Sequence, residues 1–335
     1  MKLQPGKIPL EILRDVVFKN LGAKRQEVAV GPSEGIDGAV LDLGEKSLVV
    51  SMDPITGAVE RIGWLAVNVN ANDIATFGVD PSFLFSCMLL PERSEKRLVE
   101  IISAQMNEAA KDLGIAIVGG HCESTPSLTK PIVVGCVMGL TQKGCYVTAG
   151  GAEPGDLLIL TKSAGIEGTA ILATDRERKL ENVMSKATIE AAKNFYKQIS
   201  IVRDALTAWR TGGVHAMHDP TEGGVLGGIY EMAMASNVGV KILGEAITVK
   251  PETSSICSYF HIDPLQLIGS GALLISAEAR SASKIVRSLK QAHIPASIIG
   301  EFTQRSQQRV MIKKDGSSEV LKSPLSDHLW TALER

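Results

Sequence analysis

Four aspartates lie beside small or turn-forming residues along this 335-residue chain: Asp37, Asp53, Asp73 and Asp219. Aspartate before glycine or proline is ordinary turn chemistry, so Asp37, Asp53 or Asp219 taken singly fits a turn as well as a site. Together, the four indicate a cluster of hard oxygen ligands, the kind that magnesium takes while water and substrate phosphates complete its shell. We therefore expect them to hold Mg²⁺ and a nucleotide triphosphate.

The most informative of the four is Asp73, because it interrupts an otherwise apolar helical pattern over residues 62–77. Three asparagines interrupt the same pattern: Asn68, Asn70 and Asn72. Burying such groups without partners is costly, so one explanation is a nucleotide site that includes Asn70 and Asp73. The alternative is that these side chains cap neighbouring helices or hydrogen-bond across a subunit interface, which needs no metal.

Two glycine pairs supply the second half of a phosphate site. Gly119 and Gly120 follow an apolar run, whereas Gly223 and Gly224 open a predicted helix. Both pairs allow the backbone to approach a ligand closely. The N-terminus of the predicted helix attracts anions, and Thr221 adds a hydroxyl there. Paired glycines also serve ordinary tight turns, and neither pair has the Walker or Rossmann spacing.

Three reactive side chains directly follow the first glycine pair: His121, Cys122 and Glu123. Side chains that leave the end of a strand can reach a ligand, and a carboxylate suits magnesium, so Glu123 is the expected metal ligand. A structural hydrogen bond explains His121 at least as well as catalysis does, and nothing in the sequence activates the Cys122 thiol. We assign a catalytic role to neither.

Short apolar runs alternate with amphipathic stretches in the first half of the chain, which is typical of a mixed α/β domain. The expected strands cover residues 47–52, 83–90, 115–118 and 132–140, and the expected helices cover 62–77 and 95–113. A dense run of turn residues at 150–155 predicts a domain boundary near residue 150. The expected domains are therefore residues 1–150 and 151–335.

The second half again mixes helices and strands, so the predicted fold class is α/β with mixed sheets in two domains. Strands are expected at 157–161 and near residues 240, 273 and 298, and helices at 168–173, 183–197, 202–209 and up to residue 235. A polar hairpin and a short amphipathic end are expected from residue 304. We find no internal repeat of fixed period.

Composition excludes several classes of protein. Thirty-five Lys and Arg against 37 Asp and Glu leave a net charge of −2 and no basic stripe, so nucleic acid is not an expected partner. The apolar runs fall short of the roughly 18 residues that span a bilayer, and the N-terminus lacks a secretory signal, so we expect a cytoplasmic protein. The five cysteines are widely spaced without a C-x-x-C pair, which favours reduced thiols.

Four ordered motifs resemble the superfamily that includes aminoimidazole ribonucleotide (AIR) synthetase, selenophosphate synthetase, thiamine-monophosphate kinase and HypE. They are GIDGAV at 35–40, SMDP at 51–54, VNANDIATFG at 69–78 and VGGHCE at 118–123. A fifth segment, AMHDPTEGGV at 216–225, most resembles the HypE branch. The resemblance covers nearly the whole chain.

The resemblance implies a homodimer whose N-terminal domains pair into a barrel, with Mg-ATP bound in a cleft lined by Asp37, Asp53 and Asp73. It also implies that an oxygen of a small molecule or partner protein attacks the γ-phosphate of ATP, giving a phosphorylated or activated product. Asp219 and Glu123 would complete the metal ligands, while backbone amides near Gly223 position phosphates. The expected activity is an ATP-dependent phosphotransferase or ATPase, whose acceptor and catalytic residue the sequence does not identify.

Several departures separate this chain from individual branches. HypE ends in a cysteine that accepts a carbamoyl group, whereas this sequence ends in Glu334 and Arg335 and has Cys257 as its last cysteine. This predicts that the carbamoyl-carrier mechanism is not available, which leaves hydrogenase maturation as a disfavoured alternative. No cysteine precedes Cys87, which disfavours selenophosphate synthetase. The DPTEG motif at 219–223 differs from that of thiamine-monophosphate kinase, so a kinase of that kind stays an alternative that is not preferred. A non-catalytic nucleotide-binding scaffold is the alternative from another class.

Overall fold

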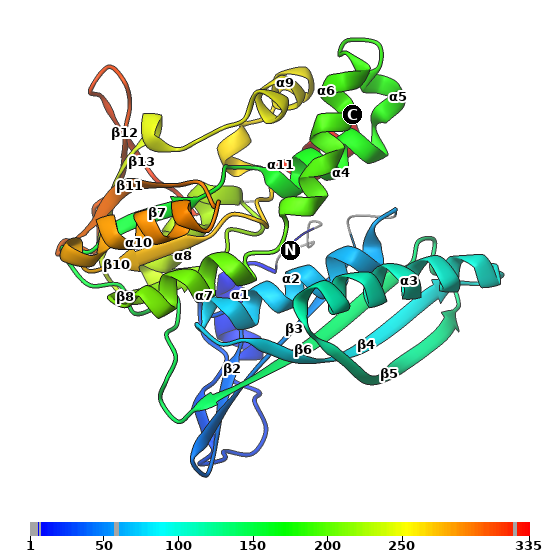
Figure 1. The fold of residues 1–335 in the computed structure, drawn as a ribbon, viewed down its shortest axis with the longest axis horizontal. Coiled ribbons are helices and arrows are strands. Elements are labelled where there is room, and N and C mark those ends of the chain that lie inside the picture. The colour runs from blue at the N-terminus through cyan, green and yellow to red at the C-terminus, as the bar shows by residue number, and fades with distance from the viewer. Residues whose placement is uncertain (1–5, 7, 57–59, 324–326) are drawn as a thin grey trace.

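The computed structural model describes residues 6, 8–56, 60–323 and 327–335. It confirms the mixed α/β fold class, with two sheets side by side along the chain (Figure 1). The first sheet has the strand order β1-β2-β3-β6-β4-β5, and the second has the order β13-β12-β9-β11-β7-β10-β8. The predicted boundary near residue 150 falls between the two sheets and stays a prediction as a domain division.

The first sheet is antiparallel except where β4 pairs with β5. Its strands are β1 (Val28–Val30), β2 (Ala39–Leu43), β3 (Lys46–Ile55), β4 (Pro81–Pro91), β5 (Ala116–Thr125) and β6 (Ile132–Gln142). Alternate residues of β6, such as Val133 and Val137, are buried toward the helices α2 (Ile62–Thr76) and α3 (Lys96–Leu113). Figure 1 shows both helices on one face of this sheet.

Helix α2 lies between the two halves of the molecule. All of its residues except Trp64 are buried. It packs on β3, β6 and α3, and it also contacts α7 (Val202–Thr211) and β8 (Val214–His218). A helix that is covered on all sides needs no polar face, so its asparagines and Asp73 must find partners inside the protein.

The second sheet is antiparallel except where β12 pairs with β9. Its remaining strands are β7 (Leu157–Thr161), β9 (Gly239–Leu243), β10 (Leu274–Ala277), β11 (Ala296–Thr303), β12 (Arg309–Ile312) and β13 (Ser318–Val320). Helices α7 and α10 (Ala279–Gln291) pack together, with α10 against β7 and β11, while α8 (Gly224–Ala235) packs against β8 and β9.

A group of helices stands beside this sheet, with α4 in contact with α6, α9 and α11. The remaining elements are α1 (Leu10–Ile12), η1 (Leu13–Val17), α4 (Ile166–Asp175), α5 (Glu177–Leu180), α6 (Lys186–Lys193), η2 (Asn194–Gln198), η3 (Gly244–Ala246), α9 (Pro251–Phe260), η4 (Pro264–Gln266) and α11 (His328–Glu334). Within the described ranges, every helix is too short or too polar to serve as a transmembrane span.

Most predicted elements are confirmed within a few residues, including β3, α2, α3, β7 and α7. Two expectations need correction, and some elements were not predicted at all. The strand expected at 115–118 continues to Thr125, the helix expected at 183–197 divides into α6 and η2, and β8 and α10 were not predicted. The strand β5 continues because its glycines permit close pairing with β4 at a register shift.

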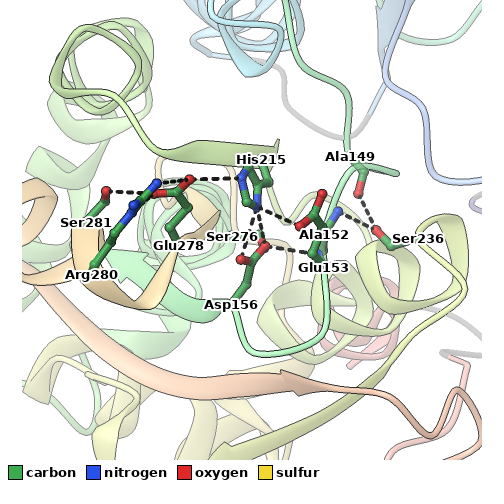
Figure 2. A network of polar contacts seen from close by, with 10 residues as sticks. All are labelled: Ala149, Ala152, Glu153, Asp156, His215, Ser236, Ser276, Glu278, Arg280 and Ser281. Carbon is green, nitrogen blue, oxygen red and sulfur yellow. Dashed lines mark hydrogen bonds and ion pairs between the residues drawn. The ribbon is translucent and has the colours of Figure 1, made fainter.

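A polar network holds the segment that enters the second sheet (Figure 2). The Asp156 carboxylate accepts hydrogen bonds from the Glu153 N–H at 2.9 Å and from the Ser276 hydroxyl at 2.7 Å. His215 Nδ1 lies 2.9 Å from the same carboxylate. Since His215 belongs to β8 and Ser276 to β10, the network ties the connecting segment to two strands of the second sheet.

Candidate functional site

The structure brings the four predicted aspartates together between the two halves. Asp53 belongs to β3, Asp73 to the last turn of α2, Asp219 follows β8, and Asp37 precedes β2. Burial raises the pKa of Asp73 well above its usual range, and the carboxylates of Asp53, Asp219 and Asp37 raise it further. The four groups are therefore close enough to repel one another, which is the electrostatic condition for a cation site.

Ser51 connects two of these aspartates. Its Oγ lies 2.6 Å from Asp73 Oδ2 and 2.6 Å from the backbone oxygen of Asp37. One hydroxyl hydrogen cannot serve both acceptors at once. A protonated Asp73 resolves this, because it can donate to Ser51 while Ser51 donates to the Asp37 carbonyl.

His218 is a site residue that the sequence did not single out. Its Nδ1 lies 2.8 Å from Asp37 Oδ2 and its Nε2 lies 2.9 Å from Glu231 Oε2. Burial opposes the charged imidazolium, but the two carboxylates outweigh it and raise the pKa of His218 to about 10. The sequence feature that could have identified His218 is its position directly before Asp219 in the AMHDPTEGGV motif at 216–225.

Asp219 is fully buried, and neither of its carboxylate oxygens has a hydrogen-bond partner among the described residues. Burial raises its pKa to about 8, with repulsion from Asp37 and Asp53 added and attraction to His218 opposing. Ligand atoms of Asp37, His218 and Asp219 lie within 4.8 Å of one another. Because an orphaned buried carboxylate is costly, the donor set fits a magnesium ion, which Asp37 and Asp219 would hold.

The asparagines of α2 act chiefly on the backbone. Asn70 Oδ1 accepts from the Asp53 N–H at 2.7 Å, and its Nδ2 donates to the Asp53 carbonyl at 3.1 Å. Asn72 Nδ2 donates to the Ile199 oxygen at 2.9 Å and its Oδ1 accepts from the Ile201 N–H at 2.9 Å. Asn70, predicted to bind the nucleotide, thus orients Asp53 in this structure.

The first glycine pair does not join the aspartate cluster within one protomer. Two strands separate β5 from β3, a distance of about 14 Å at the usual strand spacing. A Cβ on Gly120 would lie 1.9 Å from the Ser86 oxygen, so pairing with β4 explains this glycine.

The residues after the pair also differ from expectation. They lie inside β5 and not at its end, and Glu123 is exposed, with its carboxylate 3.0 Å from His121 Nε2 and 3.1 Å from Thr125 Oγ1. Cys122 is exposed in the same strand. The prediction that Glu123 shares the magnesium site therefore finds no geometric support within one protomer.

The second glycine pair opens α8 as predicted. Its anion position, however, is taken by the chain itself, because the Gly223 N–H donates to Asp327 Oδ2 at 2.7 Å. Asp327 also accepts from the N–H groups of Ile268 at 3.2 Å and Leu329 at 2.7 Å. This helix N-terminus does attract an anion, and here the anion is a side chain.

A cavity of about 70 Å³, partly open to solvent, lies beside the cluster and shares Asp53 with it. Thr221, predicted as a ligand, lines this cavity. The other lining residues are Pro54, Ile55, Thr56, Val69, Glu167, Ile171, Glu222, Ile268, Ser270, Asp327, Leu329 and Trp330. The arrangement thus joins a carboxylate cluster, suited to a metal-bound phosphate, to an adjoining cavity that opens to solvent.

Two family models match this chain. Residues 35–141 match the N-terminal domain of the AIR synthase related protein, and residues 153–313 match its C-terminal domain. The matched segments include all four aspartates, both glycine pairs and most of the cavity lining.

Curated relatives carry names connected with hydrogenases. A Methanocaldococcus jannaschii protein, whose name assigns it provisionally to hydrogenase expression or formation, is 26% identical over 331 residues, covering 96% of this chain and 95% of the relative. The carbamoyl dehydratase HypE of Rhizobium leguminosarum bv. viciae is 29% identical over 247 residues, covering 72% of this chain and 67% of the relative.

Solved structures share the fold over almost the whole chain. A chain of the HypE–HypF complex has a TM-score of 0.76 at 22% identity, covering 93% of this chain and 99% of that one. HypE in complex with ATP has a TM-score of 0.72 at 23% identity, covering 95% of each chain. AaThiL, complexed with AMPPCP and TMP, has a TM-score of 0.73 at 19% identity, covering 96% of this chain and 99% of that one.

Proposed function

We propose, from the premise that this chain belongs to the AIR synthase/HypE superfamily, that it is a magnesium- and ATP-dependent enzyme. It phosphorylates or activates an oxygen of a small-molecule or protein-borne acceptor. The observation that carries the proposal is the Asp219 carboxylate, fully buried and without a hydrogen-bond partner among the described residues. A cation that binds phosphates removes the cost of that buried charge.

Different residues of the chain would bind the metal, position its ligands and bind the acceptor. Asp37 and Asp219 would hold the metal, with Asp53 and, once deprotonated, Asp73 as further proposed ligands, while Ser51, Asn70 and His218 keep those carboxylates in position. Bound magnesium supplies neutralisation of the charge on the transferring phosphoryl group. The cavity that shares Asp53 receives the acceptor, so that its oxygen and the phosphates meet at one carboxylate.

Binding of ATP is the first test. Calorimetric titration of ATP into the wild type, with and without Mg²⁺, should show binding that depends on the metal. Asp73→Asn preserves the size of the side chain and resembles the protonated acid, so the variant should fold. Its affinity for ATP in the presence of Mg²⁺ should nevertheless fall at least about tenfold. Asp112→Asn, an exposed residue of α3, is the matched control. Absence of magnesium-dependent binding by the wild type would overturn the proposal.

The names of the relatives favour a second candidate, the ATP-dependent dehydration of a carbamoyl group. Here the carbamoyl oxygen passes to phosphate and a nitrile remains. Phosphate release from Mg-ATP, stimulated by S-carbamoylcysteine with nitrile formation detected by mass spectrometry, would support this candidate over phosphorylation of an acceptor. Tight ATP binding without turnover in any acceptor screen would instead indicate a nucleotide-binding scaffold.

We also propose that the protein is a homodimer formed through the first sheet. On the face away from α2, Met52 and Phe85 flank Cys136 in one cross-strand row, and they are 64% and 43% exposed. Phe83, 39% exposed, lies on the same face. Figure 1 shows no helix over that side of the sheet. An apolar sheet face with a free edge strand favours association with another sheet.

A further inference from the structure

Lys162, the residue directly after β7, has a buried ammonium group. Its side chain is 11% exposed. Its Nζ donates to the backbone oxygens of Gln198 at 3.1 Å, Ser200 at 2.7 Å and Gly271 at 2.9 Å. Carbonyl oxygens only accept hydrogen bonds, so the three of them use all three N–H groups that a charged ammonium offers. The hydrogen bonds therefore identify Lys162 as a cation.

A carboxylate completes the surroundings of this ammonium. Asp204 Oδ1 lies 3.1 Å from Lys162 Nζ, and Asp204 is 2% exposed. The Thr161 hydroxyl donates to the same carboxylate oxygen at 2.8 Å and accepts from the Leu273 N–H at 3.0 Å. Three carbonyl oxygens and one carboxylate oxygen thus surround one positive charge. We call these four oxygens the Lys162 cage.

The backbone of Lys162 is strained. Its φ is +54°, in the left-handed region that favours glycine over residues with a side chain. Its N–H nevertheless donates to the Pro295 oxygen at 2.7 Å. Such strain persists only where the surrounding structure fixes the residue. The four oxygens of the cage do so here, because they hold the far end of the same side chain.

The cage joins two segments that build the candidate site. Residues 198–200 hold α2, because the Ile199 oxygen accepts from Asn72 Nδ2 at 2.9 Å. Gly271 follows Ser270, which lines the cavity beside the aspartates. The two segments are in contact, since a Cβ on Gly271 would lie 2.7 Å from a backbone oxygen of the first segment. Converging carbonyl oxygens repel one another unless a positive charge lies between them.

We propose that Lys162 is an internal monovalent cation, whose ammonium fills a cation-binding cage of backbone oxygens and so positions the two segments of the site against each other. Backbone carbonyls bind potassium ions in the same manner, and the free ammonium ion has the same charge and nearly the same size. Lys162 is thus a positioning residue that acts through residues 198–200 and Gly271. The inference goes beyond the proposed function, because the cage is tested on the protein without ATP.

Lys162→Ala is the first test, because it removes the ammonium and leaves room for a free ion. Its thermal unfolding midpoint is measured in equal concentrations of ammonium, potassium and choline chloride, the last having a cation too large for the cage. We expect the midpoint to be at least about 3 °C higher in ammonium or potassium than in choline, beyond any difference that the wild type shows. The wild-type cage is already filled and gains nothing.

Two further variants serve as controls. Lys162→Met has nearly the size of lysine, carries no charge and fills the space of a free ion, so ammonium and potassium should not stabilise it. Lys197→Ala, exposed in η2, should behave as the wild type does. The cage is refuted if folded Lys162→Ala responds to the three cations no differently from the wild type or from Lys162→Met.

A double variant decides the question if Lys162→Ala does not fold. Lys162→Met leaves the Asp204 carboxylate buried without its counter-ion, which is strongly destabilising. Adding Asp204→Asn removes that charge and keeps an oxygen for the Thr161 hydroxyl. The double variant should therefore unfold at a higher urea concentration than Lys162→Met. If it unfolds at the same or a lower concentration, the ammonium does not neutralise this carboxylate and the inference is wrong.

Affinity for Mg-ATP tests whether the cage positions the site. Relative to the wild type in the same salt, Lys162→Ala should bind ATP at least about fivefold more weakly in choline chloride and nearly normally in ammonium or potassium chloride. Recovery of the unfolding midpoint without recovery of ATP affinity would overturn the positioning role. A wild type that does not bind ATP would overturn the proposed function, whereas the unfolding midpoints would still measure the cage.

Discussion

At the scale of single residues, the site and its cavity contain three carboxyl groups that the fold removes from water, those of Asp73, Asp219 and Glu167. Burial raises the pKa of Asp73 well above its usual range, that of Asp219 to about 8 and that of Glu167 to about 7. Each group keeps a proton in the folded state at pH values where the unfolded chain has lost it. Stability, pH and cation binding are therefore linked at this site.

Glu167→Gln tests this linkage. An acid whose folded-state pKa is raised stabilises the protein fully below its unfolded pKa, and that contribution is lost as pH rises through the folded value. For Glu167 this stabilising contribution is lost between pH 4.5 and about pH 7. Between about pH 5 and pH 8, the unfolding free energy of Glu167→Gln relative to wild type should therefore rise by about 2 to 3 kcal/mol. Urea unfolding of both proteins at the two pH values measures it, with Glu108→Gln as control. If the unfolding free energies of the wild type and Glu167→Gln fall by the same amount between these pH values, Glu167 does not titrate with a raised pKa in the folded state.

At the scale of elements, α2 connects the halves that build the site. It places Asp73 in the cluster, orients Asp53 of β3 through Asn70, and reaches the second half through Asn72. The Trp64 indole N–H donates to the Tyr196 oxygen at 3.2 Å along the same helix. The geometry of the site therefore depends on how firmly this one helix is held.

Asn72→Ala should destabilise the protein by about 2 to 4 kcal/mol, because it leaves the buried Ile201 N–H and Ile199 oxygen without their partner. Chemical denaturation measures this loss. Asn107→Ala, exposed on α3, should stay within about 0.5 kcal/mol of wild type. A loss in Asn72→Ala no larger than in Asn107→Ala would mean that the contact between the halves does not depend on this amide.

At the scale of the whole molecule, the open face of the first sheet predicts the oligomeric state. Light scattering should give a dimer for the wild type, twice the monomer mass of 35.7 kDa. Phe85→Asp should give a monomer with unchanged secondary structure, because an aspartate there would be buried without a partner in the dimer. Val183→Asp, 58% exposed in the second half, is the control. A wild-type monomer, or a dimer that persists in Phe85→Asp, would refute this interface.

The sequence predicted much of the fold, because periodicity and turn residues act locally. The amphipathic pattern of α3 and the alternation along β3 and β6 were sufficient to define those elements. The strand β8 was missed because five residues beside a glycine-rich turn carry little pattern of their own. The glycine pair in β5 was misplaced because paired glycines usually end a strand, whereas here close pairing with β4 requires one of them.

The sequence by itself determined the superfamily, the α/β class and the four aspartates, since motif order, period and acidic residues in turns are properties of short segments. Only the tertiary structure decided that His218 lies between Asp37 and Glu231, that Asp327 occupies the start of α8, and that Glu167 and Ser270 share one cavity. These partners lie up to 181 residues apart in the chain. No local pattern encodes such pairs, because they form only when packing of α2 brings the two halves together.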